Sequence, residues 1–180
     1  MCLPHPCRPF APAVLVACLL AACSPVFNWR EVPIADDGLV ALLPCKPDRA
    51  TRSLPLGAGA TIAVDMTGCD AGGATFAVAH VSAHNGEEAE RWMRAWRAAT
   101  RSQLADRPIA EVPATVPRAA ASPAPLRLDV QAAEGRPAQA HMLWFAQEGA
   151  GKMALYQATV LGRPESAEAL TTFFEGLRLP

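Results

Sequence analysis

The sequence predicts one α+β domain, in which two main helices cover an antiparallel β-sheet that runs as a meander. Two apolar stripes recur at helical spacing, one after Asn85 and one after Pro164. Between them lie segments of alternating polarity or short apolar runs, which are typical of strands. Nearly all links between the predicted strands are short enough to be hairpins, and hairpins join antiparallel neighbours.

Residues 1–22 predict an export signal that is absent from the mature protein. The run Phe10–Ala22 has 13 residues without a charge and follows the single basic residue Arg8. A helix of that length spans about 20 Å, which is too short for a hydrocarbon core of about 30 Å. Small residues at the end of the run suit cleavage by a signal peptidase.

The apolar run ends in Leu20-Ala21-Ala22-Cys23, which resembles the lipobox of bacterial lipoproteins. The resemblance implies a diacylglyceryl thioether on Cys23, cleavage before it, and acylation of the new N-terminus. Because Ser24 follows rather than an aspartate, it also implies sorting to the outer membrane, with the chain on the periplasmic side. Each buried methylene contributes about 0.8 kcal/mol, so several acyl chains make a lasting anchor. The alternative is an ordinary cleaved signal with an incidental cysteine.

We expect residues 23–28 to form a lipidated tether and residues 29–180 to form a single domain, a size that supports a hydrophobic core. Loss of Arg8 with the signal leaves 15 basic and 17 acidic residues. That balance gives no support to nucleic-acid binding, which needs a concentrated basic face.

Cys45 and Cys69 remain once the signal cysteines and Cys23 are set aside. An even pair in an oxidising compartment predicts a disulfide. The alternative is a zinc site that combines this pair with His80 and His84. It is disfavoured because neither cysteine belongs to a Cys-x-x-Cys motif and because the periplasm oxidises thiols.

Two apolar runs, Trp29–Ile34 and Leu39–Leu43, predict the first hairpin. Asp37 and Gly38 between them tolerate the positive φ of a type I′ turn. Asp36 and Asp37 also suggest a catalytic pair of carboxylates. The turn explains them better, because adjacent turn residues point apart.

Further strands are expected before the first helix. An extended segment is predicted over Arg49–Leu56, followed by alternating strands over Thr61–Met66 and Ala74–Ser82. Residues Thr67–Gly73 predict a hairpin loop. Their glycines do not match a phosphate-binding loop, since no helix and no Gly-Lys-Ser/Thr follow.

Asn85 begins the first predicted helix, with Glu88 completing a capping box. The apolar stripe consists of Ala89, Trp92, Met93, Trp96 and Ala99. We expect this stripe to pack on the sheet. The alternative is a small apolar ligand held between Trp92 and Trp96 and the sheet.

Residues 108–125 contain five prolines. We interpret them as an extended excursion within the domain, because too little chain follows for a second one. Strands are expected over Leu126–Gln131, Ala138–Gln147 and Met153–Leu161, with residues 148–151 as the loop between the last two.

The final helix is predicted to start at Pro164 and to end at Gly176. Its expected core stripe is Ala167, Leu170, Phe173 and Phe174. The tail Leu177–Leu179 should pack back on the sheet.

The segments Asp37–Pro44 and Phe173–Leu179 resemble parts of the PsbP-like α/β/α sandwich, and the sequence is similar to proteobacterial envelope lipoproteins of unknown function. Known members of that fold mostly bind other proteins. The resemblance therefore implies a binding role, and no catalytic motif carries over with it.

Two classes of function are compatible with the sequence. The favoured hypothesis is a non-catalytic binding or scaffolding lipoprotein without a cofactor, anchored in the membrane through Cys23, whose partner is another envelope protein. The second is an enzyme of unrecognised type that uses His80, His84 and Asp70. The chain has no Gly-x-Ser-x-Gly, His-Glu-x-x-His, Walker or dinucleotide motif, which favours the first hypothesis.

Overall fold

The computed structural model describes residues 26–57, 59–104, 106–130 and 139–180. Residues 1–25 are outside this part, so the expected signal and residues 23–25 of the tether, including Cys23, lie outside the described residues, as do Gln131 and Ala138 at the ends of two predicted strands. The elements, in chain order, are β1 (Arg30–Ile34), β2 (Leu39–Leu43), β3 (Asp48–Gly57), β4 (Ala60–Ala71), β5 (Ala74–Ala83), α1 (Gly86–Gln103), β6 (Ile109–Pro113), β7 (Leu126–Val130), β8 (Ala140–Gly149), β9 (Lys152–Gly162) and α2 (Ala167–Glu175).

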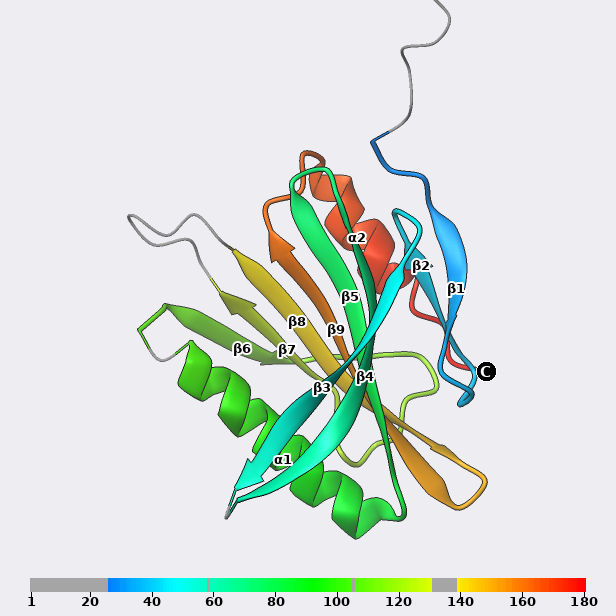
Figure 1. Ribbon diagram of the computed structural model, residues 1–180, viewed down its shortest axis with the longest axis vertical. Coiled ribbons are helices and arrows are strands. Elements are labelled where there is room, and N and C mark those ends of the chain that lie inside the picture. The colour runs from blue at the N-terminus through cyan, green and yellow to red at the C-terminus, as the bar shows by residue number, and fades with distance from the viewer. Residues whose placement is uncertain (1–25, 58, 105, 131–138) are drawn as a thin grey trace, which may run out of the picture.

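Seven strands form one antiparallel sheet in the order β3-β4-β5-β9-β8-β7-β6 (Figure 1). The remaining two strands, β1 and β2, pair only with each other as a separate hairpin. The predicted α+β class, with helices packed on an antiparallel sheet, is confirmed.

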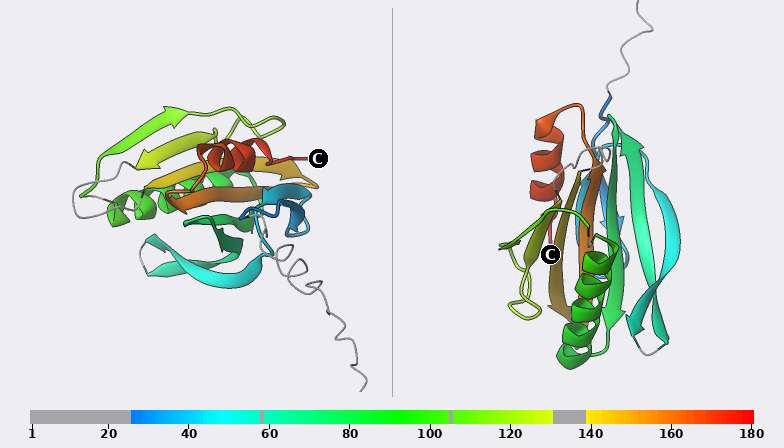
Figure 2. Two further views of the ribbon diagram at one scale, coloured as in Figure 1. Left: turned by 90° about the horizontal axis from the view of Figure 1, so that it is seen from above. Right: turned by 90° about the vertical axis from the view of Figure 1, so that its left-hand side faces the viewer.

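The sheet separates two layers of side chains. Successive residues of a strand point to opposite faces, so Phe145 enters one hydrophobic cluster while Trp144 and Ala146 enter the other. Helix α1 packs on the second face, and α2 shares the first face with the β1–β2 hairpin. Figure 2 shows these layers from two further directions.

The sheet is not the single meander that the sequence predicted. Helix α1 carries the chain from β5 across to β6 at the far edge, and the chain then returns through β7 and β8. Strand β9 therefore lies between β8 and β5. The physical reason is its composition, because side chains on both faces of β9 are apolar and a central position buries both.

The first hairpin forms as predicted, but its turn is different. Ile34 pairs with Leu39, so four residues form the loop, and the left-handed φ values fall on Ala35 and Gly38. The prediction of a two-residue turn with positive φ at Asp37 was wrong. The longer loop leaves the Asp37 side chain free to reach the sheet.

Two loop predictions were too long. Strand β4 continues to Ala71, so Gly72 and Gly73 alone make the turn that was assigned to Thr67–Gly73. Similarly, β8 extends to Gly149. Glycine and polar residues marked these segments as loops, but pairing with neighbouring strands keeps them extended.

Helix α1 begins as the sequence predicts. The Asn85 side chain accepts a hydrogen bond from the Glu88 amide at 2.9 Å. The Glu88 carboxylate returns to the amide of His84 at 2.7 Å rather than to that of Asn85. On the apolar stripe, Trp96 is only 4% exposed, whereas Trp92 is partly buried.

Helix α2 starts later than predicted. It begins at Ala167, and its first turn is capped by the Ser166 side chain, which accepts from the Glu168 amide at 3.2 Å. Pro164 therefore precedes the helix. Ala169, rather than the predicted Ala167, is buried beside Phe173, because contacts with the rest of the domain decide which face of a helix is buried.

The Cys45–Cys69 disulfide is present, with its Cα atoms 5.9 Å apart. It joins the chain just after β2 to β4, so it ties the separate hairpin to the main sheet. The proline-rich segment contributes edge strand β6 and then returns through an Ala120–Ala146 backbone hydrogen bond of 2.8 Å. Within the described residues, no helix is both long and apolar enough to cross a membrane.

Candidate functional site

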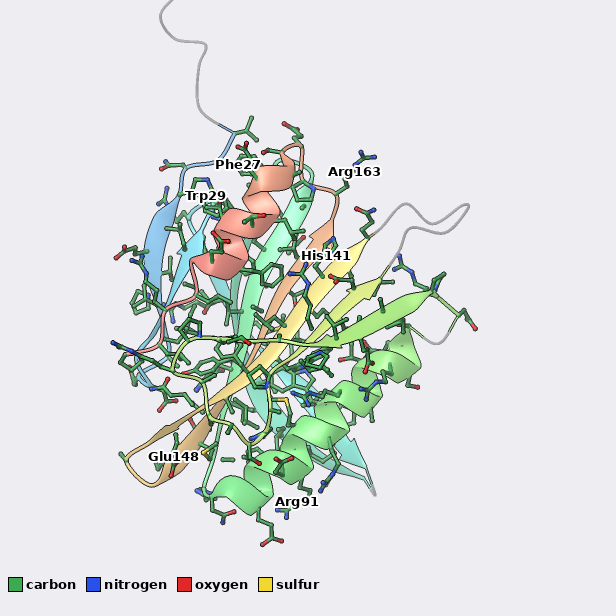
Figure 3. The ribbon with its side chains drawn as sticks, turned by 180° about the vertical axis from the view of Figure 1, so that it is seen from behind. Phe27, Trp29, Arg91, His141, Glu148 and Arg163 are labelled. Carbon is green, nitrogen blue, oxygen red and sulfur yellow. A yellow bond between two sulfur atoms is a disulfide. The ribbon has the colours of Figure 1, made fainter. Side chains whose placement is uncertain are left out.

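A groove of about 610 Å³ lies beside the C-terminal end of α2. One wall is the segment 114–118 after β6, and the other is the end of α2 with the tail that follows it. Residues of β7 and β8 complete it, on the face where His141 is labelled in Figure 3.

The floor of the groove is apolar. It is formed by four side chains that also belong to the hydrophobic cluster between the sheet and α2, namely Val116, Leu143, Leu177 and Leu179. The tail takes an extended course because Arg178 and Val40 exchange two backbone hydrogen bonds, of 2.8 and 2.9 Å. Extended backbone sends Leu177 and Leu179 to one side and Arg178 to the other.

Arg127 is the most firmly held charge on the rim. Its Nε donates to both carboxylate oxygens of Asp129 at 3.0 Å, and its guanidinium lies 4.9 Å from the centre of the Phe174 ring. His141 donates to the same carboxylate from Nδ1, at 2.6 Å. Among the described residues, no acceptor contacts the terminal nitrogens of Arg127, so they can bind an anion at the groove.

Arg118 and Arg178 also belong to the groove lining, but Arg178 directs its side chain to Glu31, away from the leucines of the floor. Arg118 donates to the Leu179 carbonyl at 3.5 Å, a long contact, and its side chain is exposed. Arg178 pairs with Glu31 at 2.5 Å on the surface. Among the described residues that line the groove, Glu175 is the only carboxylate, and Arg118 is the only arginine without a carboxylate partner. An apolar floor beneath cationic groups suits an apolar ligand that bears a carboxylate.

A second polar cluster lies beneath the β1–β2 turn. His80 Nε2 lies 2.6 Å from Asp37 Oδ2, and Ser82 Oγ donates to the same oxygen at 2.8 Å. His80 is almost fully buried, while the Asp37 side chain is one-third exposed. The sequence places His80 here because residues Phe76, Val78 and His80 share one face of β5.

The Asp37 cluster does not activate Ser82 as a nucleophile. A carboxylate only accepts hydrogen bonds, so the proton between His80 and Asp37 resides on Nε2. That nitrogen therefore cannot accept the Ser82 proton across the 3.4 Å between them. The cluster instead fastens the β1–β2 turn to the sheet. Burial, with the charge of Asp37, raises the pKa of the neighbouring Tyr156 hydroxyl, which stays neutral.

The residues of the enzymatic hypothesis are not brought together. His80 is bonded to Asp37, His84 is exposed at the start of α1, and Asp70 accepts from Thr75 at 2.5 Å near the other end of β5. Cys45 and Cys69 are joined to each other. No group of three or more potential metal ligands occurs within the ranges that the structure describes.

The alternative of a ligand between the tryptophans and the sheet receives no support. Trp96 packs directly into the cluster that contains Trp144 and Leu155, and Trp92 packs on its edge. Side chains therefore fill the space that such a ligand would need, and the groove lies on the opposite face of the sheet.

Sequence reasoning missed both Asp37 as a partner of His80 and the arginines of the groove. A buried histidine requires a partner, so the position of His80 on the apolar face of its strand signalled that one exists. Nothing local identified Asp37, which is 43 residues away. Arg118, Arg127 and Arg178 come from three separate segments and share no motif.

Neither a protein-family model nor a curated protein matches this chain.

Proposed function

We propose that the protein is a lipoprotein of the bacterial envelope, anchored on the periplasmic side of the outer membrane by lipid on Cys23, that binds another envelope protein without catalysing a reaction. The Leu-Ala-Ala-Cys sequence supports the anchor. The Cys45–Cys69 disulfide supports an oxidising compartment. The placement of α1 and α2 on opposite faces of the sheet supports a fold of the PsbP-like sandwich type.

One observation carries the binding role, which is the groove with its apolar floor and arginine rim. The partner that fits it is an extended protein segment with apolar side chains and a carboxylate. Apolar side chains of the segment would cover Val116 and Leu143, while the carboxylate would meet Arg118 and Arg127. Arginine binds carboxylates in a two-pronged geometry, which fixes the position of the segment as well as adding affinity.

The anchor is tested by replacing the lipidated cysteine. Cys23→Ala should abolish the incorporation of labelled palmitate and move the protein from the detergent phase to the aqueous phase. The unaltered protein is the control. Unchanged acyl labelling and partitioning of the variant would refute the anchor.

The groove is tested by photocrosslinking in intact cells. A photoreactive amino acid at Thr115, on the groove wall, should give one discrete adduct with an envelope protein, joined at an acidic segment. The same amino acid at Arg94, on the exposed side of α1, is the control. Arg118→Glu should abolish the Thr115 adduct because it reverses one charge of the rim.

Two results would contradict the groove proposal. The first is a Thr115 adduct that survives Arg118→Glu or that also forms from position 94. The second is a co-purifying small lipid that mass spectrometry finds crosslinked at Thr115, which would assign the groove to a small anionic ligand instead of a protein.

A further inference from the structure

Phe27 marks the point where the described domain becomes firmly packed. Its ring covers Gly72 so closely that a Cβ added there would collide with it. The ring also stacks on Trp29, with 5.8 Å between centres, and meets the edge of Phe76 at 6.3 Å. The next amide, of Asn28, donates to the Pro44 carbonyl at 2.7 Å. The start of the domain is therefore fixed to the turn between β4 and β5.

Very little chain separates this fixed point from the proposed lipid. Only Ser24 and Pro25 lie between Cys23 and Val26. Fully extended, the three steps from Cys23 to Val26 span about 11 Å at most. A lipid on Cys23 therefore brings the β4–β5 turn to the membrane surface, because no slack remains for the domain to stand away from it.

A second loop lies at the same end of the molecule. The amide of Glu165, between β9 and α2, donates to the Gly72 carbonyl at 2.8 Å. Figure 1 shows the β4–β5 turn and the start of α2 at the end of the molecule where the described chain begins. In Figure 3, Phe27 and Arg163 are labelled at this end, and Glu148 is labelled at the opposite one.

The chemistry of this end suits a layer of lipid headgroups. Three large hydrophobic side chains are exposed among the described residues, and two of them, Val26 at 54% and Leu161 at 46%, lie here. Leu161 and Gly72 line the same shallow hollow, and the Val26 side chain also lies against Gly72. Arg163 is exposed beside them, while Asp70 and Glu165 are exposed carboxylates that offset its charge. Apolar contact, rather than net charge, is therefore the attractive term.

We propose that this end of the domain, the tether end, rests directly on phospholipid headgroups through Val26 and Leu161, with Arg163 exposed beside the contact. The inference rests on the proposed lipidation of Cys23 and adds an orientation to it. The long axis of the domain then stands away from the membrane. Helix α2 begins at the tether end and runs away from it, so the groove at its far end stays clear of the lipid and open to a partner (Figures 1 and 2).

The orientation is tested with fluorescent probes on the full lipidated protein. Arg163→Cys and Glu148→Cys variants are each labelled with a nitrobenzoxadiazole fluorophore, since the disulfide and the lipid leave the other mature cysteines unreactive. The proteins are placed in vesicles of phosphatidylethanolamine and phosphatidylglycerol that contain a nitroxide on the lipid headgroup. Quenching at Arg163 should exceed quenching at Glu148 severalfold.

Two further variants distinguish lipid contact made by the domain itself from closeness to the membrane that the short tether imposes. A flexible Gly-Ser linker inserted after Ser24 should keep the protein acylated and vesicle-bound. If the tether end binds lipid without the short tether holding it there, quenching of the probe at position 163 should persist in part in the linker variant. Adding Leu161→Glu to the linker variant should then remove it, because a carboxylate replaces the apolar contact.

The outcomes distinguish the orientation from the anchor. If the protein is acylated and vesicle-bound but the two probes are quenched equally, the orientation is wrong and the anchor stands. If Leu161→Glu leaves quenching unchanged in the linker variant, the contact through Leu161 is wrong. A protein that carries no acyl chain and stays free of vesicles refutes the anchor, and the orientation with it.

Discussion

Replacing Trp96 by alanine tests how α1 holds to the sheet. Trp96 is 4% exposed and packs among Met93, Trp144 and Leu155 on the α1 face. The variant would leave a cavity in this cluster that neighbouring side chains fill only in part. The loss therefore combines the transfer of apolar surface to water with the energy of an unfilled space.

The expected loss is large relative to the stability of a domain. A buried tryptophan removes about 150–250 Å² from water. Truncating such a residue in a core costs about 3–5 kcal/mol. A domain is stable by about 5–15 kcal/mol in all. Since 1 kcal/mol lowers the melting temperature of a domain of this size by about 2–4 °C, we expect Trp96→Ala to lower it by about 6–20 °C.

Thermal unfolding followed by circular dichroism measures this shift, and the same stripe supplies the control. Trp92 lies one helical turn earlier and is only partly buried, so Trp92→Ala should lower the melting temperature less than Trp96→Ala. Wild-type melting of both variants would refute the packing of α1. A larger effect at Trp92 would show that the cluster is centred elsewhere.

Three further changes have expected outcomes. Replacing Cys45 and Cys69 together by serine should cost about 3–4 kcal/mol in urea unfolding, because the bond closes a loop across 24 residues; equal midpoints for variant and wild type would contradict this. Arg101 donates to Glu111 through two nitrogens and lowers the pKa of its carboxyl. This pair should therefore stabilise the fold by about 0.2–1 kcal/mol above about pH 5, and the stabilisation should disappear as the pH falls through the lowered pKa. Glu111→Gln should therefore match wild type in stability at low pH only, and a constant difference across pH would contradict the assignment. Asp37→Ala should lower the free energy of unfolding by about 1–3 kcal/mol, because it leaves the buried His80 without its hydrogen-bond partner at Nε2. Asp36→Ala, at the adjacent exposed position, should lower it little, and equal losses for the two variants would contradict the His80–Asp37 bond.

Local patterns determined the elements of this protein, except edge strand β6 in the proline-rich segment, and several details of their ends. The alternation along β5 and β7, the helical spacing of the α1 stripe and the Asn85 cap each depend on residues a few positions apart. Such features follow from local geometry, because a helix or strand places its side chains by its own repeat. The Cys45–Cys69 bond was predictable for a different reason, since the expected export left one pair to join.

Element ends were predicted less well where neighbours decided them. Glycines around Gly68 indicated a loop, yet pairing with β5 keeps β4 extended as far as Ala71. Pro164 is a common first residue of a helix, but Ser166 supplies the cap and α2 starts after it. In both cases a hydrogen bond outweighed the preference of a residue type.

What the sequence determined by itself is therefore the set of elements apart from β6, the face that most of them bury, and the one disulfide. Only the tertiary structure decided that β9 enters between β5 and β8, that Asp37 meets His80, and that Arg118 and Arg127 come together at one apolar groove. These meetings depend on strand order and register, which arise when apolar surfaces from distant segments cover one another. No repeat along the chain encodes them, because burial selects an arrangement of the whole domain rather than of any one segment.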